Sequence, residues 1–303
     1  MYLILKKVLN IFSNKMDQCI NKMLHIETDG GIFDEIIDCT YVLLCCGKNP
    51  QREENVYTQL EILNPSKHII IVYNSGYKLC KYSSSSSDDL RNAQLYIFNH
   101  ALDNNYKRIL YLEDDFYLSQ QIPNKDIDSI THFITKEDPT IYGLGNLILP
   151  SLSTLFSKHQ KALGNLVYIS HAIIYNQNYM KNAILFKANN PKNYMIDQIT
   201  KHIPNSKNYR YYKALIYQTF PVTDNQVNSW EIMFPKPLKK IGMNSLEKFI
   251  KTTKLDKTHE PGFNILYLLP YIFYGIIFIL VLLLLFFIYK KLKLNRSNKK
   301  YPK

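Results

Sequence analysis

Residues 108–118 read Arg-Ile-Leu-Tyr-Leu-Glu-Asp-Asp-Phe-Tyr-Leu, and this stretch decides the fold. An apolar run of strand type, 108–112, ends in three consecutive acids, Glu113, Asp114 and Asp115. Because an unpaired carboxylate is costly inside a sheet, acids belong at the open end of a strand. Carboxylates gathered there can bind a divalent cation, and that cation can hold a phosphate-bearing substrate.

Alternating strand and helix patterns precede the acids. They read as strand 40–46, helix 53–63, strand 68–73, helix 89–103 and strand 108–112. This order predicts an α/β domain with a mostly parallel sheet and crossover helices. Ligands of such sheets bind at the carboxyl ends of the strands. We therefore expect Gly47, Asn74 and the three acids to lie at one edge.

The flanking segments are less regular. The weak pattern of 3–23 allows a short helix, the serine run 83–87 reads as a loop, and Asp88 is suited to cap the helix after it. Later segments read as strands 140–149 and 165–175, helices 178–186 and 194–202, an apolar run 213–219 and a loop 221–230.

A membrane segment is predicted near the C-terminus. Residues 263–289 carry no charge and exceed the roughly 20 residues that a spanning helix needs. A basic cluster follows at once. The expected divisions are an N-terminal extension 1–37, an α/β domain 38–234, a stalk 235–262, a transmembrane helix 263–289 and a basic tail 290–303.

The orientation of the domain across the membrane is a separate question. The excess of Lys and Arg after the span favours a cytoplasmic tail and an external domain, in the ER or Golgi lumen. The start of the chain shows no clear export signal, and no Asn-X-Ser/Thr acceptor precedes the span. We therefore expect a cytosolic domain, with the luminal placement as the alternative.

Net charge and cysteine content limit the partners and the kinds of metal site that we expect. The formal charge is +12, but the chain shows no helix-turn-helix, zinc-finger or RNA-binding signature, so nucleic acid is not an expected partner. The five cysteines match no zinc spacing, and Cys45 and Cys46 lie side by side in an apolar run. We expect reduced, structural thiols.

The acids have both a functional and an ordinary interpretation. On an extended chain Glu113 and Asp115 point to one side and Asp114 to the other. Carboxylates so placed suit a hard cation such as Mg²⁺ or Mn²⁺. The ordinary interpretation is a solvated loop or a helix N-terminus, where acids are favourable.

The segment Leu110-Tyr-Leu-Glu-Asp-Asp-Phe116 resembles the acidic metal motif of GT-A glycosyltransferases. It is closest to the Glu-Asp-Asp form of family 25, which includes lipopolysaccharide and collagen sugar transferases. Looser similarities lie at 49–52 with 59–63, 101–107, 164–168, 182–183, 196–197, 216–218 and 228–229. The Gly-rich element with Cys and Ser-His that often precedes the acids in family 25 is not found here.

The resemblance implies a GT-A, Rossmann-like fold and an enzyme that moves a sugar from a nucleotide-diphosphate donor, of the UDP-sugar type, to a glycan, lipid or protein acceptor. Mn²⁺ or Mg²⁺ would be held by Glu113, Asp114 and Asp115, with Asp114 also facing the donor. The remaining candidates are Lys48, Arg52 and Asn74 for donor binding, and Asp197 and Asp224 for the general base.

Each candidate has a plainer role beside it. Lys48 and Arg52 can be a solvated helix start, Asp197 an exposed helix acid, and Asn74 a turn former; His171 is more often a hydrogen-bonded structural histidine. At the level of the chain, the alternative is an inactive GT-A-like scaffold anchored in the membrane. A metal-dependent nucleotidyltransferase or phosphatase would need more acids on neighbouring strands.

Overall fold

The computed structural model describes residues 19–45, 50–80, 83–119, 122–168, 171–190, 199–219, 247–258 and 260–299. The strands are β1 (Ile20–Glu27), β2 (Cys39–Cys45), β3 (His68–Asn74), β4 (Arg108–Glu113), β5 (Phe116–Leu118), β6 (Ile141–Gly143), β7 (Leu147–Pro150), β8 (His159–Tyr168), β9 (Ala172–Asn176), β10 (Asn208–Tyr211) and β11 (Ile216–Gln218). The helices are α2 (Pro50–Ile62), α3 (Ser86–Asp103), α4 (Asn124–Glu137), α5 (Gln177–Asn189) and α9 (Gly262–Lys299), with 3-10 turns η2 (Leu152–Thr154) and η3 (Thr200–His202). Residues 247–253 form a further short helix.

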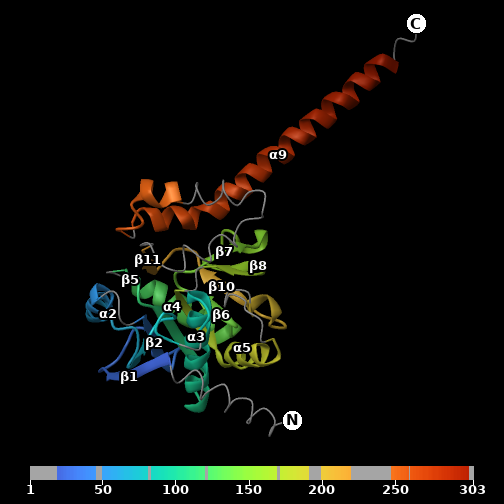
Figure 1. The fold of residues 1–303 in the computed structure, drawn as a ribbon. Coiled ribbons are helices and arrows are strands. Elements are labelled where there is room, and N and C mark those ends of the chain that lie inside the picture. Colours follow the sequence, from blue (N-terminus) through green and yellow to red (C-terminus); the bar gives the residue numbers. More distant parts are fainter. Residues whose placement is uncertain are drawn as a thin grey trace.

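A nine-stranded sheet forms the centre of the domain (Figure 1). Its strand order is β1-β3-β2-β4-β9-β6-β10-β8-β7. The pairings place β2, β3, β4, β6, β7 and β10 in one direction and β1, β8 and β9 in the other. The predicted α/β class with a mostly parallel sheet is therefore confirmed. The short strands β5 and β11 form a separate antiparallel pair.

Two apolar cores cover the two faces of the sheet. Alternation along β2 sends Tyr41 and Leu43 to one core and Val42 and Leu44 to the other. Helices α3 and α5 pack on the first face, through residues such as Phe98 and Tyr179. Helices α2 and α4 cover the second face. Strands buried on both faces explain why the first half of the chain reads as continuous apolar runs.

The N-terminal part of the described chain belongs to the sheet. β1 pairs with β3 from Ile20 to Glu27, so the expectation that a helix reaches residue 23 is wrong. The sequence pattern there is weak, and cross-strand pairing with β3 decides the structure. The folded domain thus includes β1, whereas the predicted domain boundary at residue 38 assigns these residues to an N-terminal extension.

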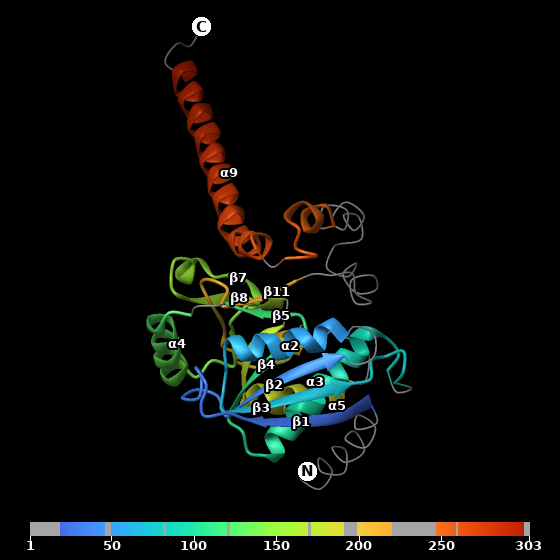
Figure 2. The ribbon, with the colours of Figure 1, turned by 90° about the vertical axis from the view of Figure 1, so that its left-hand side faces the viewer.

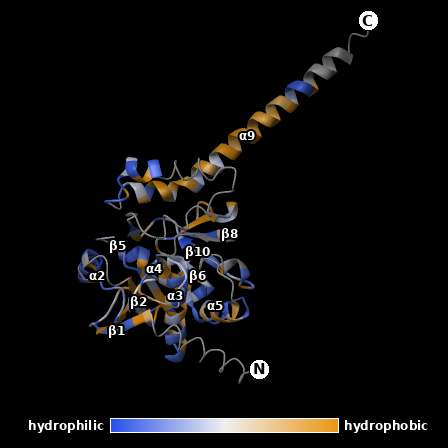
Figure 3. Cartoon of the chain, viewed as in Figure 1, coloured by the Kyte–Doolittle hydropathy of each residue, from blue (hydrophilic) through white to orange (hydrophobic). Residues whose placement is uncertain are grey.

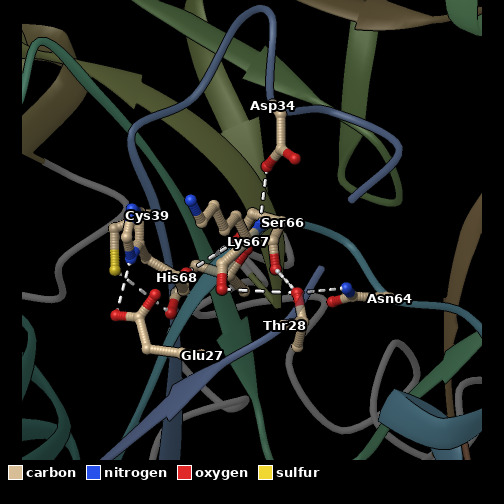
Figure 4. Close-up of polar contacts among 9 residues, drawn as sticks. Glu27, Thr28, Asp34, Cys39, Asn64, Ser66, Lys67 and His68 are labelled. Atoms are coloured by element: carbon tan, nitrogen blue, oxygen red, sulfur yellow. Dashed lines mark hydrogen bonds and ion pairs between the residues drawn. The ribbon is translucent and has the colours of Figure 1, made fainter. Parts of the chain in front are cut away.

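Polar contacts fasten the loop after β1 to the loop before β3 (Figure 4). The Asp34 carboxylate accepts from the backbone N–H of Lys67, and the Thr28 hydroxyl donates to the carbonyl of Ser66. Gly31 lies against the Ser66 backbone so closely that a Cβ atom would stand 2.1 Å from its Cα. This contact tolerates only glycine.

A disulfide joins Cys19, just before β1, to Cys80, in the loop after β3. The expectation of reduced cysteines is therefore wrong for this pair. The two cysteines are separated by 61 positions in sequence, and only the pairing of β1 with β3 brings their Cα atoms to 5.3 Å. Cys39 is a buried free thiol.

The second half departs from its sequence pattern in several places. The predicted strands 140–149 and 165–175 each divide, into β6 and β7 and into β8 and β9. Helix α4 and strand β10 had no clear sequence signal. At the start of α3, the Ser85 hydroxyl rather than Asp88 caps the helix, and it accepts from the Asp88 N–H. The predicted helix 194–202 falls largely outside the described residues, and the predicted loop 221–230 lies wholly outside them.

The described residues contain one helix long and apolar enough to cross a membrane, Gly262–Leu292 within α9. Figures 1 and 2 show α9 leading away from the sheet beyond β7, and Figure 3 shows its apolar length. The character of the helix changes at Pro270. Before it, one face is buried on the domain, whereas almost every side chain from Ile272 to Leu292 is exposed.

The first turns of α9 form a small third core with the domain. Phe263, Leu266 and Tyr267 pack against Ala214, Tyr217 and Leu255. The guanidinium of Arg210 lies 4.3 Å above the Tyr267 ring, and its Nε donates to the Gln160 side chain. Such a cation–π contact contributes on the order of 2 kcal/mol when desolvated. The start of α9 is thus part of the folded domain.

We expect Phe263→Ala to destabilise the domain by about 3 to 5 kcal/mol, because Phe263 is fully buried and its removal leaves a cavity. The matched control is Phe273→Ala, the same change on the same helix at a side chain that is 48% exposed. Thermal unfolding of the full chain in detergent checks this. Equal midpoints for the two variants would show that α9 does not pack on the domain.

Candidate functional site

The three acids lie where β4 gives way to a turn. β4 ends at Glu113, Asp114 and Asp115 form the turn, and β5 begins at Phe116. Residues 109–112 of the preceding run are fully buried, whereas the turn brings carboxylates to the carboxyl edge of the sheet. Glu113 is half-buried and stands opposite Leu43 of β2. Its backbone N–H donates to the carbonyl of His171.

Asp114 is held by two groups from the neighbouring strand and helix. Its Oδ1 lies 2.5 Å from Nη1 of Arg52 on α2, and its Oδ2 accepts from the backbone N–H of Cys45 at the end of β2. Burial raises the pKa of Asp114, and Arg52 acts in the opposite direction. Both oxygens are therefore used in holding α2 and β2 to the end of β4.

Asp115 lies beside the same guanidinium. Its Oδ2 is 4.0 Å from Nη2 of Arg52, and its Oδ1 accepts from Nε2 of Gln218 on β11. The expectation that Asp114 and Asp115 point to opposite sides is therefore wrong. Strand alternation stops at Glu113, and the turn after it carries both aspartates to Arg52.

The electrostatics of Asp115 differ from those of a solvated acid. Burial and the neighbouring Asp114 raise its pKa from 3.8 to about 7, although Arg52 and Gln218 partly oppose the rise. Burial alone would lower the pKa of Arg52, but Asp114 and Asp115 raise it. The site thus pairs one permanent cation with two acids that compete for it.

Gln218 contributes a further oxygen. Its Nε2 is used by Asp115, and its Oε1 is buried with no hydrogen-bond partner within the described part of the chain. In sequence Gln218 had only a loose family similarity to mark it. Its role comes from the antiparallel pairing of β11 with β5, which sets Gln218 opposite Phe116.

Asn74 reaches the same edge but a different cluster. It ends β3, opposite Cys45 of β2, so β2 separates it from Glu113. Its Nδ2 donates to Asp89 at the start of α3, which also accepts from Ser83. The structure therefore brings Arg52, Asp114 and Asp115 together and places Asn74 one strand away.

His171 is a structural histidine that links the site to α9. It is fully buried, its Nε2 lies 3.1 Å from the carbonyl oxygen of Ile216, and its ring packs edge-on against Phe263. On β11, Tyr217 also packs edge-on against Phe263, while the next residue, Gln218, bonds Asp115. The acid site and the first turn of α9 are thus connected through two short paths.

The donor set can be compared with what a divalent cation needs. Mg²⁺ is commonly bound by one or two carboxylates together with substrate phosphates. Asp115, Glu113 and the unpaired Gln218 Oε1 offer hard oxygens of this kind. The engaged oxygens of Asp114 favour a positioning role, and its predicted part as a metal ligand stays a prediction. The ligand oxygens of Glu113, Asp114 and Asp115 do not form a group within 4.8 Å of one another, so a cation held here by few protein ligands stays a prediction.

One cluster in the described residues gathers three metal-type side chains within 4.8 Å of one another. It consists of Cys19, Cys80 and Asp89. Its two sulfur atoms are joined in the disulfide, so they are not available as thiolate ligands. This cluster fixes the loop after β3 and the start of α3, one strand away from the acids.

Several predicted site residues lie outside the described residues. They are Lys48, Asp197 and Asp224. Lys48 falls between β2 and α2, Asp197 follows α5, and Asp224 follows β11. Their roles in donor binding and as the general base stay predictions.

No protein-family model and no curated protein matches this chain. Among solved structures it is similar to A197 from STIV, at 9% identity and a TM-score of 0.36, over 61% of this chain and 86% of that one. It is also similar to a glycosyltransferase involved in the glycosylation of the major capsid of PBCV-1, at 12% identity and a TM-score of 0.37, over 61% of this chain and 96% of that one.

We expect the metal-free protein to lose stability as the pH rises from about 4 to about 7. The folded state holds a proton on Asp115 over this range, whereas the unfolded state releases it near pH 3.8. The loss attributable to Asp115 is on the order of 2 to 4 kcal/mol. Denaturant unfolding with a chelator present measures it. In Asp115→Asn this part of the pH dependence should disappear, and an unchanged profile would contradict the assignment.

Proposed function

We propose that this protein is a glycosyltransferase that moves a sugar from a nucleotide-diphosphate donor, of the UDP-sugar type, to a glycan, lipid or protein acceptor. The observation that carries this is the position of Asp115. It lies in the turn after a parallel strand, between the Arg52 guanidinium and the Gln218 amide. The resemblance of this segment to the GT-A acidic motif supports the proposal and supplies the reaction class.

The site residues have different roles in the proposed mechanism. Mn²⁺ or Mg²⁺ held by Glu113 and Asp115 would neutralise charge on the departing diphosphate. Arg52 places a second positive charge beside the same oxygens and holds Asp114 in place. Asp114 keeps α2 and β2 fixed against β4, which preserves the spacing of the acids. Asp197 or Asp224 would accept the proton of the acceptor hydroxyl.

A second candidate is an inactive scaffold with the same domain. The observation that favours it is the Arg52–Asp114 ion pair, which uses an acid of the motif without any cation. A scaffold needs neither a nucleotide sugar nor a metal. The two functions therefore differ in whether a UDP-sugar with Mn²⁺ is turned over by the protein or shifts its thermal midpoint.

The membrane anchor and its orientation belong to the same proposal. The apolar part of α9 anchors the domain in a membrane. The Cys19–Cys80 disulfide favours the external or luminal placement over the cytosolic one, because cytosolic thiols are kept reduced. The basic tail favours the same orientation through the positive-inside rule. We therefore prefer the alternative placement, with the domain in an oxidising compartment.

We expect Asp115→Ala to abolish Mn²⁺-dependent hydrolysis or transfer of a UDP-sugar, with a loss of at least about 100-fold. Arg52→Ala should reduce activity and also destabilise the domain, because it leaves Asp114 buried without its cation. Product release from a radiolabelled donor measures the activity. The control is Glu61→Ala, which removes an exposed carboxylate at the C-terminal end of α2, whereas Arg52 lies near the start of this helix.

Two results would count against the enzyme. Asp115→Ala with normal activity would remove the metal assignment, and unfolding measurements would show that the variant is folded. No response of the parent protein to any UDP-sugar with Mn²⁺, in either activity or thermal midpoint, would favour the scaffold.

The orientation has its own test. We expect a denatured sample taken directly from cells to bind two more maleimide groups after reduction than before it, because Cys19 and Cys80 are oxidised in place. Cys19→Ser together with Cys80→Ser is the control and should show no such difference. Equal labelling of the parent before and after reduction would place the domain in a reducing compartment.

A further inference from the structure

The turn between β7 and β8 exposes two large apolar side chains. Phe156 is 89% exposed and Leu152 is 70% exposed. Single exposed apolar residues are ordinary on a protein surface. These two share one short turn, residues 151–158, and this turn lies beside α9. We call this segment the β7–β8 turn.

The β7–β8 turn lies against the beginning of the apolar length of α9. The Phe156 ring is 6.1 Å from the ring of Tyr271, centroid to centroid. The Tyr274 hydroxyl donates to the carbonyl of Pro150, and Nε2 of Gln160 donates to the Tyr271 hydroxyl. The turn is therefore fixed at the level of Tyr271.

The length of the apolar helix indicates where Tyr271 lies relative to the bilayer. Residues 272–289 are 18 in number and rise about 27 Å, close to the roughly 30 Å of a bilayer's hydrocarbon core. No charged residue occurs between Phe263 and Tyr289. With Tyr289 at the far end of the span, the hydrocarbon core begins near Tyr271. No polar spacer then separates the domain from the bilayer.

The first turns of α9 are consistent with this level. Their inner face is buried on the domain, and the outer face exposes Leu268 and Leu269. A surface that is apolar on its outer side beside a membrane span is suited to the lipid interface rather than to water. The exposed leucines and the β7–β8 turn thus border the same point of entry.

Charge on the turn matches a lipid surface. Lys158 and Lys161 are exposed and flank Phe156 on its C-terminal side. Exposed Lys248 and Lys251 lie on the short helix 247–253, just before α9. Lysines are attracted to anionic headgroups, while apolar side chains enter the interface beside them. Apolar tips flanked by lysines are the composition of a peripheral membrane contact.

We propose that the β7–β8 turn is a second membrane-contact site, which inserts Leu152 and Phe156 into the interface of the phospholipid bilayer that α9 spans. The inference rests on the proposed anchor and not on the transferase activity. Two contacts, the span and the turn, fix the rotation of the domain about α9. The β7 edge of the sheet then faces the lipid, and the β1 edge faces away from it (Figures 1 and 2).

The test measures contact between the turn and acyl chains. The full chain is reconstituted into vesicles of phosphatidylcholine and phosphatidylglycerol, with or without bromine near the glycerol end of the acyl chains, which quenches nearby tryptophan. Trp230 is the only native tryptophan, so the parent protein gives the background. Phe156→Trp and, as a second position, Leu152→Trp report on the turn.

Leu79→Trp is the matched control. Leu79 is an apolar side chain that is 69% exposed in the loop after β3. β3 lies seven strand spacings from β7, or roughly 33 Å. We expect brominated lipid to reduce the added emission of the Phe156→Trp variant at least about twofold and to leave that of the Leu79→Trp variant unchanged. Replacing Lys158 and Lys161 by Glu should weaken the quenching in anionic vesicles.

Several outcomes would overturn the proposal. Equal quenching at positions 156 and 79 would show that the turn does not reach the bilayer. Emission at position 156 that brominated lipid does not quench, but that changes when the protein is diluted with unbrominated lipid, would identify a second copy of the chain as the occupant. Extraction of the parent protein from the vesicles by alkaline carbonate would show that the anchor itself fails, a result separate from any loss of enzyme activity.

Discussion

The Arg52–Asp114 ion pair is the contact on which the site depends. It joins α2 to the turn after β4, and the backbone N–H of Cys45 completes the carboxylate's hydrogen bonds. A buried acid without these partners would be costly, so the two strands and the helix must keep their relative positions. The same guanidinium approaches Asp115, which links the rigidity of the edge to the chemistry of the site.

The first half of the fold was predictable from sequence, because its elements have strong local signals. The strands β2, β3 and β4 are continuous apolar runs, and α2 and α3 have helical spacing between clear breaks. β1 could not be predicted in this way. It is an edge strand with no fully buried side chain, and its structure comes from pairing with β3. The Cys19–Cys80 disulfide depends on the same long-range pairing.

The site shows a similar division. Glu113, Asp114, Asp115 and Arg52 were identifiable because acids and an arginine follow strand-type runs, and the structure brings the last three together. The orientation of the acidic side chains could not be predicted, because the alternation of a strand does not extend into a turn. Nor does any local pattern show that β11 would bring Gln218 to Asp115 from more than a hundred positions away. Such contacts follow from topology alone.

Strand β11 has a mechanical consequence. Tyr217 packs on Phe263 at the base of α9, and the adjoining Gln218 holds Asp115. Neighbouring residues of a strand face opposite ways, so this short strand touches α9 with one side chain and the acid with the next. A thinner bilayer makes a spanning helix tilt. In the membrane-anchored protein that we propose, a tilt that moved Phe263 would be transmitted to Asp115 across one peptide unit, so the thickness of the host membrane would be a variable of the site.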